Sequence, residues 1–376
     1  MSKSFLNFFK ALSVFCAAII GAGIFVLPYT ASKFGFWGTS VFLVILSFLI
    51  IIIHRLLGEI VIGTNEISSV PGYTEEYLGL KVKNFSLFIS ATEIVGMLLI
   101  YILLGGQFLY ALLNPYIGGS QNLFIVIFFV VSSLLVYRGS GAKSQFNIDI
   151  FGILIILFIF LINAWSVFDF KNLVGGFSAQ YSGFPYGVLV FALWGLATVP
   201  GLYGLVEKNE KQYRMVINWG IILSAIFYLL FTILILGVSG ANISGDALTG
   251  FSAIISGNLV KLGFVLGLIV VLSSLLAFGR SLKKIFHKDA MLSKPMAWIF
   301  ACFLPFSLFL IKFTDFVNIM SGVGAFLITA ESIIVVFIYR KFFQSKFNKK
   351  PPFYTILLLT FFTLVIIFEF WYFFIN

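Results

Sequence analysis

The sequence has little charge and few of the residues that build metal or catalytic centres. Only 10% of its 376 residues are Asp, Glu, Lys or Arg, against roughly 25% in soluble proteins, so an ordinary soluble domain is excluded. Cys16 and Cys302 both lie in apolar runs and make neither a disulfide framework nor a metal site. His54 and His287 stand beside basic residues, where we expect helix ends, so a zinc or haem centre is not expected.

Apolar residues make up 61% of the chain, and the mean hydropathy is +1.10. Since about 20 consecutive apolar residues cross a bilayer, the sequence predicts an all-α polytopic membrane protein. The loop 239–256 and the segment 69–79, which turns at Pro71 and Gly72, are each expected to hold a short surface helix. Eleven membrane spans are predicted, at 11–33, 37–62, 84–113, 121–138, 146–168, 184–205, 215–238, 257–281, 294–312, 315–340 and 353–374.

Positive charge predicts how these spans are oriented. With the N-terminus in the cytoplasm, only Lys33, Lys171, Lys261 and Lys312 of the 24 Lys and Arg residues fall outside. The positive-inside rule favours this arrangement, which places the C-terminus outside and predicts an integral protein of the plasma (inner) membrane. The net charge of +10 therefore indicates membrane topology and attraction to anionic lipid. No basic domain indicates a nucleic-acid partner.

The first span is interrupted in the middle by Gly21, Gly23 and Pro28. Glycine lacks a Cβ and proline lacks an N–H donor, so we expect the helix to break there. Broken backbone at that depth survives only inside protein or beside a water-filled cavity. Its free N–H groups can bind a carboxylate and its free carbonyl groups a cation. The alternative is that the glycines only allow close helix packing.

The sixth span is interrupted in the same way, by Gly195 and Pro200. Pro28 follows Gly23 by five residues and Pro200 follows Gly195 by five. Two broken spans at corresponding positions of two five-span halves indicate an inverted-repeat transporter.

Two motifs resemble a known family. Gly-Ala-Gly-Ile-Phe-Val-Leu-Pro-Tyr at 21–29 resembles the first-helix signature of the amino acid/auxin permease family and its aromatic amino acid permease relatives, within the amino acid–polyamine–organocation superfamily. Phe-Ala-Leu-Trp-Gly-Leu-Ala-Thr-Val-Pro at 191–200 is similar to the sixth-helix motif. The resemblance implies a leucine-transporter-type fold, a 5+5 inverted repeat with broken helices 1 and 6 and an eleventh helix. Its single domain, 1–376, would comprise repeats over about 11–168 and 184–340 and an extra helix over about 353–374.

The predicted substrate is a neutral amino acid, apolar or aromatic. We expect backbone N–H groups of the first break to bind its carboxylate and carbonyl groups of both breaks to bind its ammonium. Its side chain would lie against Phe191, Trp194 and Leu196, although Trp194 could equally pack in the core. The predicted binding residues are Ile19, Gly21, Ala22, Gly23, Ile24, Phe191, Ala192, Leu193, Trp194 and Gly195.

The coupling ion is Na+ or H+, and no other cofactor is expected. In sodium-coupled members of the fold, adjacent hydroxyl residues complete a sodium site, and the matching positions are Ala17, Ile20, Ser273 and Ser274. Oxygen ligands suit this cation, but serines also commonly bond back to their own helix. Acids inside spans are functional candidates. Glu93, which could also bind the substrate ammonium, and Glu331, which could instead serve only as a structural polar contact between helices, are therefore candidates for carrying a proton.

Three charged residues near the cytoplasmic ends of spans are candidates for a gate. Glu59 lies four residues after Arg55, so the two side chains can pair on one helix face. Asp149 is expected to pair with Lys143 or Arg138.

These features predict a secondary active transporter that imports a neutral amino acid by alternating access. An amino acid exchanger and a transport-inactive sensor on the same fold are the alternatives. An enzyme would need convergent catalytic groups, which the sequence does not bring together. The expected partners are the amino acid and the lipid bilayer, with no obligate protein partner.

Overall fold

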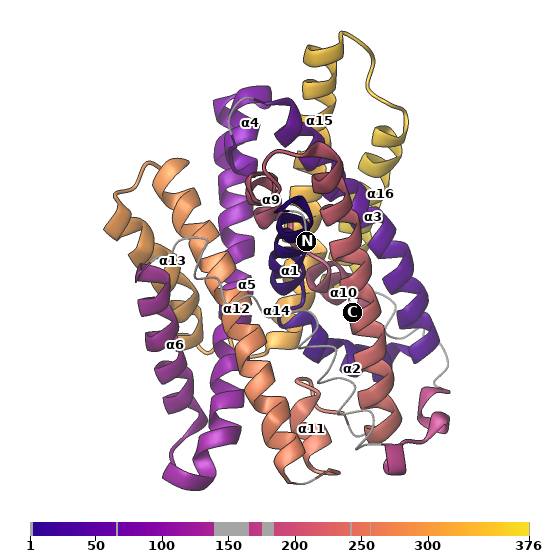
Figure 1. The fold of residues 1–376 in the computed structure, drawn as a ribbon, viewed down its shortest axis with the longest axis vertical. Helices are drawn as coiled ribbons and strands as arrows, with labels where there is room; N and C mark the ends of the chain where they lie inside the picture. The colour runs from indigo at the N-terminus through magenta and orange to yellow at the C-terminus, as the bar shows by residue number, and fades with distance from the viewer. Residues whose placement is uncertain are drawn as a thin grey trace.

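The computed structural model describes residues 3–64, 67–138, 165–174, 184–240, 243–255 and 257–375. Within these ranges every regular element is a helix. Figure 1 shows long helices running along one axis, with α1 enclosed between α5 and α12 on one side and α3 and α10 on the other.

The first span consists of two helices, α1 (Lys3–Ile19) and α2 (Gly23–Phe34), which meet at an angle of 51°. The next four helices follow the predicted order, with the short α4 on the segment where a surface helix was expected. They are α3 (Phe36–Gly63), α4 (Val70–Leu78), α5 (Leu80–Ile117) and α6 (Gln121–Arg138). The short 3-10 turns η2 (Trp165–Val167) and η3 (Phe170–Leu173) precede the second half.

The second half also begins with a broken span. It consists of α8 (Phe184–Ala192), the 3-10 turn η5 (Leu196–Thr198) and α9 (Val199–Leu205). The remaining helices are α10 (Glu210–Ser239), α11 (Leu248–Ser252), α12 (Asn258–Lys288), α13 (Lys294–Leu310), α14 (Phe316–Gly322), the π-helical turn η6 (Val323–Ile328), α15 (Thr329–Phe347) and α16 (Tyr354–Ile375).

Most of the predicted spans are present. Among the described residues, eight helical segments are long and apolar enough to cross a membrane, and the bent pair α1 and α2 makes a ninth. Helix α13 is shorter, at 17 residues, and lies on the predicted ninth span. Most of the predicted fifth span, including Asp149, lies outside the described residues.

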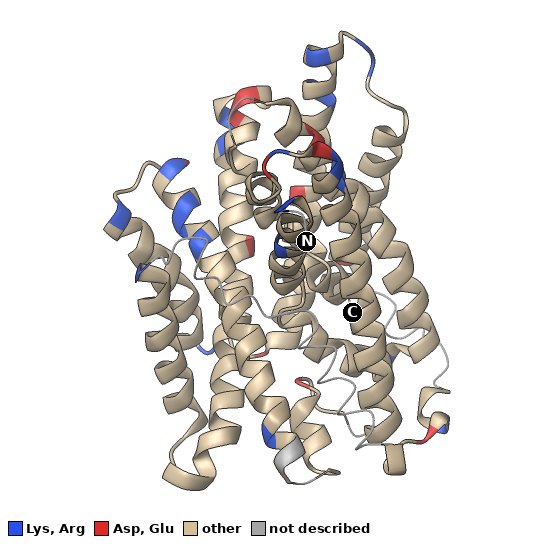
Figure 2. Ribbon diagram, viewed as in Figure 1, with Lys and Arg blue, Asp and Glu red and all other residues tan. Residues whose placement is uncertain are grey.

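The charged residues gather at one end of the molecule. Figure 2 shows most of the blue and red segments near α4, the loop after α9 and the end of α15. This is the predicted cytoplasmic end. Between the two ends, the apolar side chains of α1, α2, α5, α8 and α10 fill one continuous core. Helices α6 and α16 instead expose many apolar side chains, as expected for surfaces that face lipid.

Candidate functional site

At the break in the first span the backbone leaves the helix, and the glycines there pack very closely against neighbouring residues. Three residues, Ile20 to Ala22, separate α1 from α2. A Cβ on Gly21 would lie 2.8 Å from Ser274 Oγ and 2.9 Å from Tyr101 Oη. A Cβ on Gly23 would lie 2.5 Å from the Cβ of Ala192. Both interpretations of the glycines therefore hold, since the helix breaks and the glycines also let the two broken spans touch.

The break in the sixth span is capped by a histidine from α3. The N–H of Gly195 donates to His54 Nε2 at 3.2 Å, and His54 Nδ1 lies 2.9 Å from the carbonyl oxygen of Ile50. These partners assign the proton to Nδ1 and leave the ring neutral. The expectation that His54 lies at a helix end was wrong, because α3 continues past it to Gly63, and its ring is completely buried beside this break. In the sequence, the adjacent Arg55 suggested a helix end, whereas the long apolar run before His54 indicated that the histidine is buried.

One tyrosine joins the two breaks. The hydroxyl oxygen of Tyr228, on α10, lies 2.7 Å from the carbonyl oxygen of Ile19 and 2.6 Å from that of Ala192. Both carbonyls were predicted to bind the substrate ammonium. Tyr228 carries no motif, and its role could not be found from the sequence.

The predicted substrate residues meet at one place. Ile19 and Ile24 of the first span and Phe191 to Trp194 of the sixth are all buried in the core. Gly195 lies against α1, since its Cβ would be 2.8 Å from Ile19 Cγ1. The N–H groups at the start of α2, at Gly23 and Ile24, have no acceptor one turn earlier in that helix. The structure thus brings together the residues predicted to bind substrate.

A cavity of about 320 Å³ lies on the predicted cytoplasmic side of both breaks. Its volume is within the range of small-molecule sites. It extends from the middle of the molecule to α4 and the last turns of α12. Its polar lining consists of Ser68, Ser69, Ser90, Glu93, Thr198, Ser273, Arg280, Ser281, Lys284 and Glu331, and the residues next to the breaks, Ala17, Ala18, Leu196 and Ala197, also line it.

The two acids predicted to carry a proton meet at the inner end of this cavity. Glu93 of α5 and Glu331 of α15 are both buried, and their carboxyl groups lie close enough to interact. Ser90, one turn before Glu93, donates its hydroxyl to Glu331 Oε1, whereas Glu93 Oε2 is buried and has no hydrogen-bond partner among the residues that the structure describes. Glu331 lies in the first turn of α15, directly after the π-helical turn η6, an element that is frequent at functional sites.

Trp194 lies between the sixth-span break and these acids. Its indole packs edge-on against the His54 ring, with the centroids 5.1 Å apart. Its buried Nε1 makes no hydrogen bond of ordinary geometry, yet it lies near the carboxyl groups of both Glu93 and Glu331. Trp194 therefore packs in the core, as one of the two predictions for it stated. It also lies between the break and the two acids.

The predicted sodium ligands come from α1 and α12, and two of them are neighbours. Ser274 Oγ donates to the carbonyl oxygen of Ala17 at 2.9 Å. Since a hydroxyl has one proton, Ser274 does not donate back to its own helix. Ser273 lines the cavity, and Ile20 lies at the break. This set of oxygen donors fits a hard cation.

The predicted gate pair is wrong in its partner. Glu59 binds Arg214 of α10, with Nε at 2.6 Å from Oε1 and Nη2 at 2.8 Å from Oε2. Arg55 instead donates to the side chain of Asn218 at 3.3 Å. The planar guanidinium of Arg214 donates to both oxygens of the Glu59 carboxylate. Arg55, on the same helix as Glu59, does not make this pair. Helix α3 is therefore joined to α10 near the predicted cytoplasmic end.

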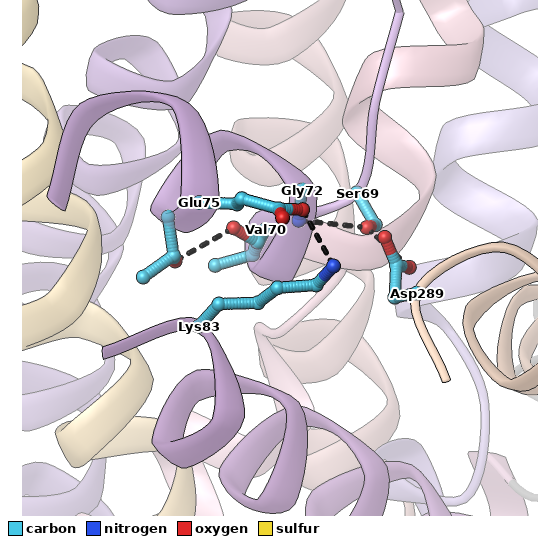
Figure 3. A network of polar contacts seen from close by, with 7 residues as sticks. Ser69, Val70, Gly72, Glu75, Lys83 and Asp289 are labelled. Carbon is cyan, nitrogen blue, oxygen red and sulfur yellow. Dashed lines mark hydrogen bonds and ion pairs between the residues drawn. The ribbon is translucent and has the colours of Figure 1, made fainter. Parts of the chain in front are cut away.

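The predicted cytoplasmic end of the cavity is bordered by a polar network between α4 and the end of α12 (Figure 3). Ser69 Oγ accepts from the N–H of Gly72 at 3.2 Å and donates to Asp289 Oδ2 at 2.6 Å. Lys83 binds Glu75 at 2.5 Å beside them. Burial raises the pKa of Asp289, although the Ser69 hydroxyl and the charges of Lys83 and Lys284 oppose this effect.

The sequence profile of the tryptophan/tyrosine permease family matches residues 5–375. The chain belongs to this family. The resemblance to aromatic amino acid permeases is therefore confirmed. Membership in a permease family, together with the membrane-spanning helices, identifies an integral membrane protein that acts as a transporter rather than an enzyme. A search among curated proteins returned no match.

Solved structures share the fold. MhsT in complex with L-phenylalanine superposes with a TM-score of 0.69 at 15% identity, over 98% of both chains. Mhp1, a nucleobase-cation-symport-1 family transporter in a closed conformation with bromovinylhydantoin bound, gives 0.68 at 13% identity over 90% of this chain and 78% of that one. Its inward-facing conformation gives 0.66 at 11% identity, over 91% and 77%. The predicted leucine-transporter-type fold is therefore confirmed.

Proposed function

We propose that this protein is a secondary active transporter that imports an aromatic or other apolar neutral amino acid together with protons. The observation that carries the proposal is the meeting of Glu93 and Glu331 in a cavity whose lining includes Ala17 and Ala18 before the first break and Leu196 and Ala197 at the second. Membership in the tryptophan/tyrosine permease family supports the substrate class.

The two breaks supply groups for both ends of a zwitterion. N–H groups in the first turn of α2 are aligned with the positive end of the helix dipole and favour a carboxylate. Carbonyl groups at the ends of α1 and α8 favour the ammonium group. The amino acid side chain would contact Phe191, Trp194 and Leu196.

The acidic pair is suited to hold and release one proton. Two ionised carboxylates in contact inside a membrane protein are costly, so the pair favours a state with at most one negative charge. The cavity connects it to the predicted cytoplasmic side, where the proton would leave. Because Trp194 lies near both carboxyl groups, a change of charge there would act directly on the broken segment of the sixth span.

Other charged and titratable groups around the pair are few among the described residues. Arg280 and Lys284 of α12 line the same cavity, with Asp289 at its mouth, and His54 of α3 lies behind Trp194. The two basic residues lie toward the predicted cytoplasmic end of the cavity.

Several finer features belong to the same proposal. We place the protein in the amino acid–polyamine–organocation superfamily and in the plasma (inner) membrane, with its N-terminus in the cytoplasm and its C-terminus outside. Sodium coupling through Ala17, Ile20, Ser273 and Ser274 is the second candidate, supported by the adjacency of Ala17 and Ser274. Exchange and sensing are the alternatives.

Uptake into liposomes tests the proposal. Purified protein is reconstituted, and accumulation of radiolabelled L-tryptophan, L-tyrosine and L-phenylalanine is measured with an inside-alkaline pH gradient, with and without Na+. We expect the pH gradient alone to drive accumulation. Glu93→Gln and Glu331→Gln should abolish this accumulation while counterflow of the same amino acid persists, and Ser274→Ala should leave both unchanged.

Each other outcome points to a different function. Accumulation that needs Na+ and is lost in Ser274→Ala would establish sodium coupling in place of proton coupling. Counterflow without accumulation would identify an exchanger. Binding that raises the melting temperature without any flux would identify a sensor, and no binding of any amino acid would refute the substrate class.

A further inference from the structure

A single hydroxyl group satisfies the carbonyl ends of both broken helices. Tyr228 Oη lies 2.7 Å from the carbonyl oxygen of Ile19, the last residue of α1, and 2.6 Å from that of Ala192, the last residue of α8. The tyrosine is completely buried. Its hydroxyl is also near Gly23, whose added Cβ would lie 3.4 Å from it.

These two carbonyl groups need donors, and among the described residues that of Ile19 has a second one, the N–H of Gly21 at 2.7 Å, whereas that of Ala192 has Tyr228. The last carbonyls of a helix have no partner within it, and they carry the negative end of the helix dipole. Leaving a buried acceptor unpaired costs about 1–3 kcal/mol. Tyr228 has only one proton to share between two acceptors, so it pairs each of them incompletely.

An ammonium group would satisfy the same two acceptors better. It has three N–H donors and a positive charge, and hydrogen bonds with an ionised donor are about twice as strong as neutral ones. One ammonium nitrogen could donate to both carbonyl oxygens with separate protons and still keep a third.

We propose that the Tyr228 hydroxyl holds the position of the substrate's α-ammonium group until the amino acid binds, and that the ammonium displaces it from both carbonyls. This inference rests on the proposed function and deepens it. Tyr228 is a positioning residue that keeps the ends of α1 and α8 together and makes entry conditional on a primary ammonium group. An acid with the same aromatic side chain but no amino group has no donor with which to displace the hydroxyl.

Tyr228→Phe tests the proposal by removing only the hydroxyl. The variant should melt at a lower temperature without ligand, because the buried Ala192 carbonyl loses its donor and the Ile19 carbonyl keeps only the N–H of Gly21. It should bind L-tryptophan more tightly than the native protein does, by roughly two- to tenfold, because no hydrogen bond to the hydroxyl has to be broken. Indole-3-propionate, which lacks the amino group, should raise the melting temperature of neither protein.

Tyr213→Phe is a matched control. Tyr213 lies on the same helix, is completely buried and donates to the carbonyl oxygen of Val199, at the start of α9, at 3.0 Å. Its loss should lower the melting temperature without changing the affinity for L-tryptophan. If Tyr228→Phe binds L-tryptophan with unchanged or weaker affinity, the hydroxyl stays in place or belongs to the bound site, and the inference is wrong.

If Tyr228→Phe does not fold, a second measurement still tests the proposal. Incorporation of 3-fluorotyrosine at position 228 retains the hydroxyl and reports its surroundings by ¹⁹F NMR. The signal should move on addition of L-tryptophan and stay in place with indole-3-propionate; an unmoved signal with L-tryptophan would overturn the inference. If the native protein binds no amino acid at all, the proposed function itself is refuted, which separates the two failures.

Discussion

Arg214 on α10 donates to both carboxylate oxygens of Glu59 on α3, from Nε at 2.6 Å and from Nη2 at 2.8 Å. Helix α3 also contacts α8 and α9 of the sixth span, and α10 contacts α1 and α2 of the first. The pair thus connects two helices that support the breaks, near their predicted cytoplasmic ends.

Arg214→Lys should weaken this connection, because a lysine ammonium cannot make the two parallel bonds of a guanidinium. The expected loss is about 1 kcal/mol, since both side chains are about one-third exposed and solvent screens the pair. Thermal unfolding of the purified variant measures it. Arg55→Lys, which alters only a 3.3 Å bond to Asn218, is the control, and an equal loss in both variants would contradict the prediction.

Gly23→Ala should destabilise the crossing of the two broken spans. The new Cβ would lie 2.5 Å from Ala192 Cβ and 2.6 Å from its Cα, and overpacking of this kind costs about 1–3 kcal/mol. Gly201→Ala is the matched control on α9, where an added Cβ meets no atom within 4 Å. The control should be neutral or slightly stabilising. If the melting temperatures of the two variants fell by the same amount, the close approach of Gly23 to Ala192 would not be rigid.

His54→Leu should leave the N–H of Gly195 without its acceptor. Because this group is buried at the sixth-span break, we expect a loss of about 1–3 kcal/mol, measured by thermal unfolding. His54→Gln is the rescue variant, since its side-chain oxygen can take the place of Nε2 as acceptor. Stability of the leucine variant equal to that of the native protein would show that the break needs no cap from α3.

Ser69→Ala removes the N-cap of α4, which accepts from the N–H of Gly72, and also the hydroxyl that binds Asp289. Loss of such a cap typically costs about 1 kcal/mol. Hydrogen exchange followed by mass spectrometry should show faster exchange in α4 than in the native protein. Ser69→Thr retains the hydroxyl and should restore protection; equal exchange in the alanine variant would rule out a stabilising role for the cap.

Asp289→Asn should change how stability depends on pH. Burial raises the pKa of the native carboxyl above its ordinary value of 3.8, so the folded protein favours the protonated form. The stability contributed by this group is fully present below pH 3.8 and is lost as the pH rises through the folded pKa. The melting temperature of the native protein relative to the variant should therefore fall over that interval, whereas a constant difference would contradict the pKa shift.

Much of the fold could be predicted because its signals are local. Apolar runs long enough to cross a bilayer define the spans, and the glycines of the first and sixth spans mark where the helices break. Pro28, also expected to break the first span, instead lies inside the continuous helix α2. The breaks at Ile20–Ala22 and between Ala192 and Leu196 lie where the glycines indicated. Such preferences act within a few residues of the chain, so they are readable in its order.

The choice of partners was decided by the tertiary structure alone. Glu331 meets Ser90 across 241 positions, Glu59 pairs with Arg214 across 155, and Tyr228 reaches Ile19 across 209. Composition marked Glu93 and Glu331 as candidates, but only packing places them together, and only packing gives His54 its position at the break. A buried polar group takes whichever partner the packed helices bring within about 3 Å, and no local pattern in the sequence specifies that neighbour.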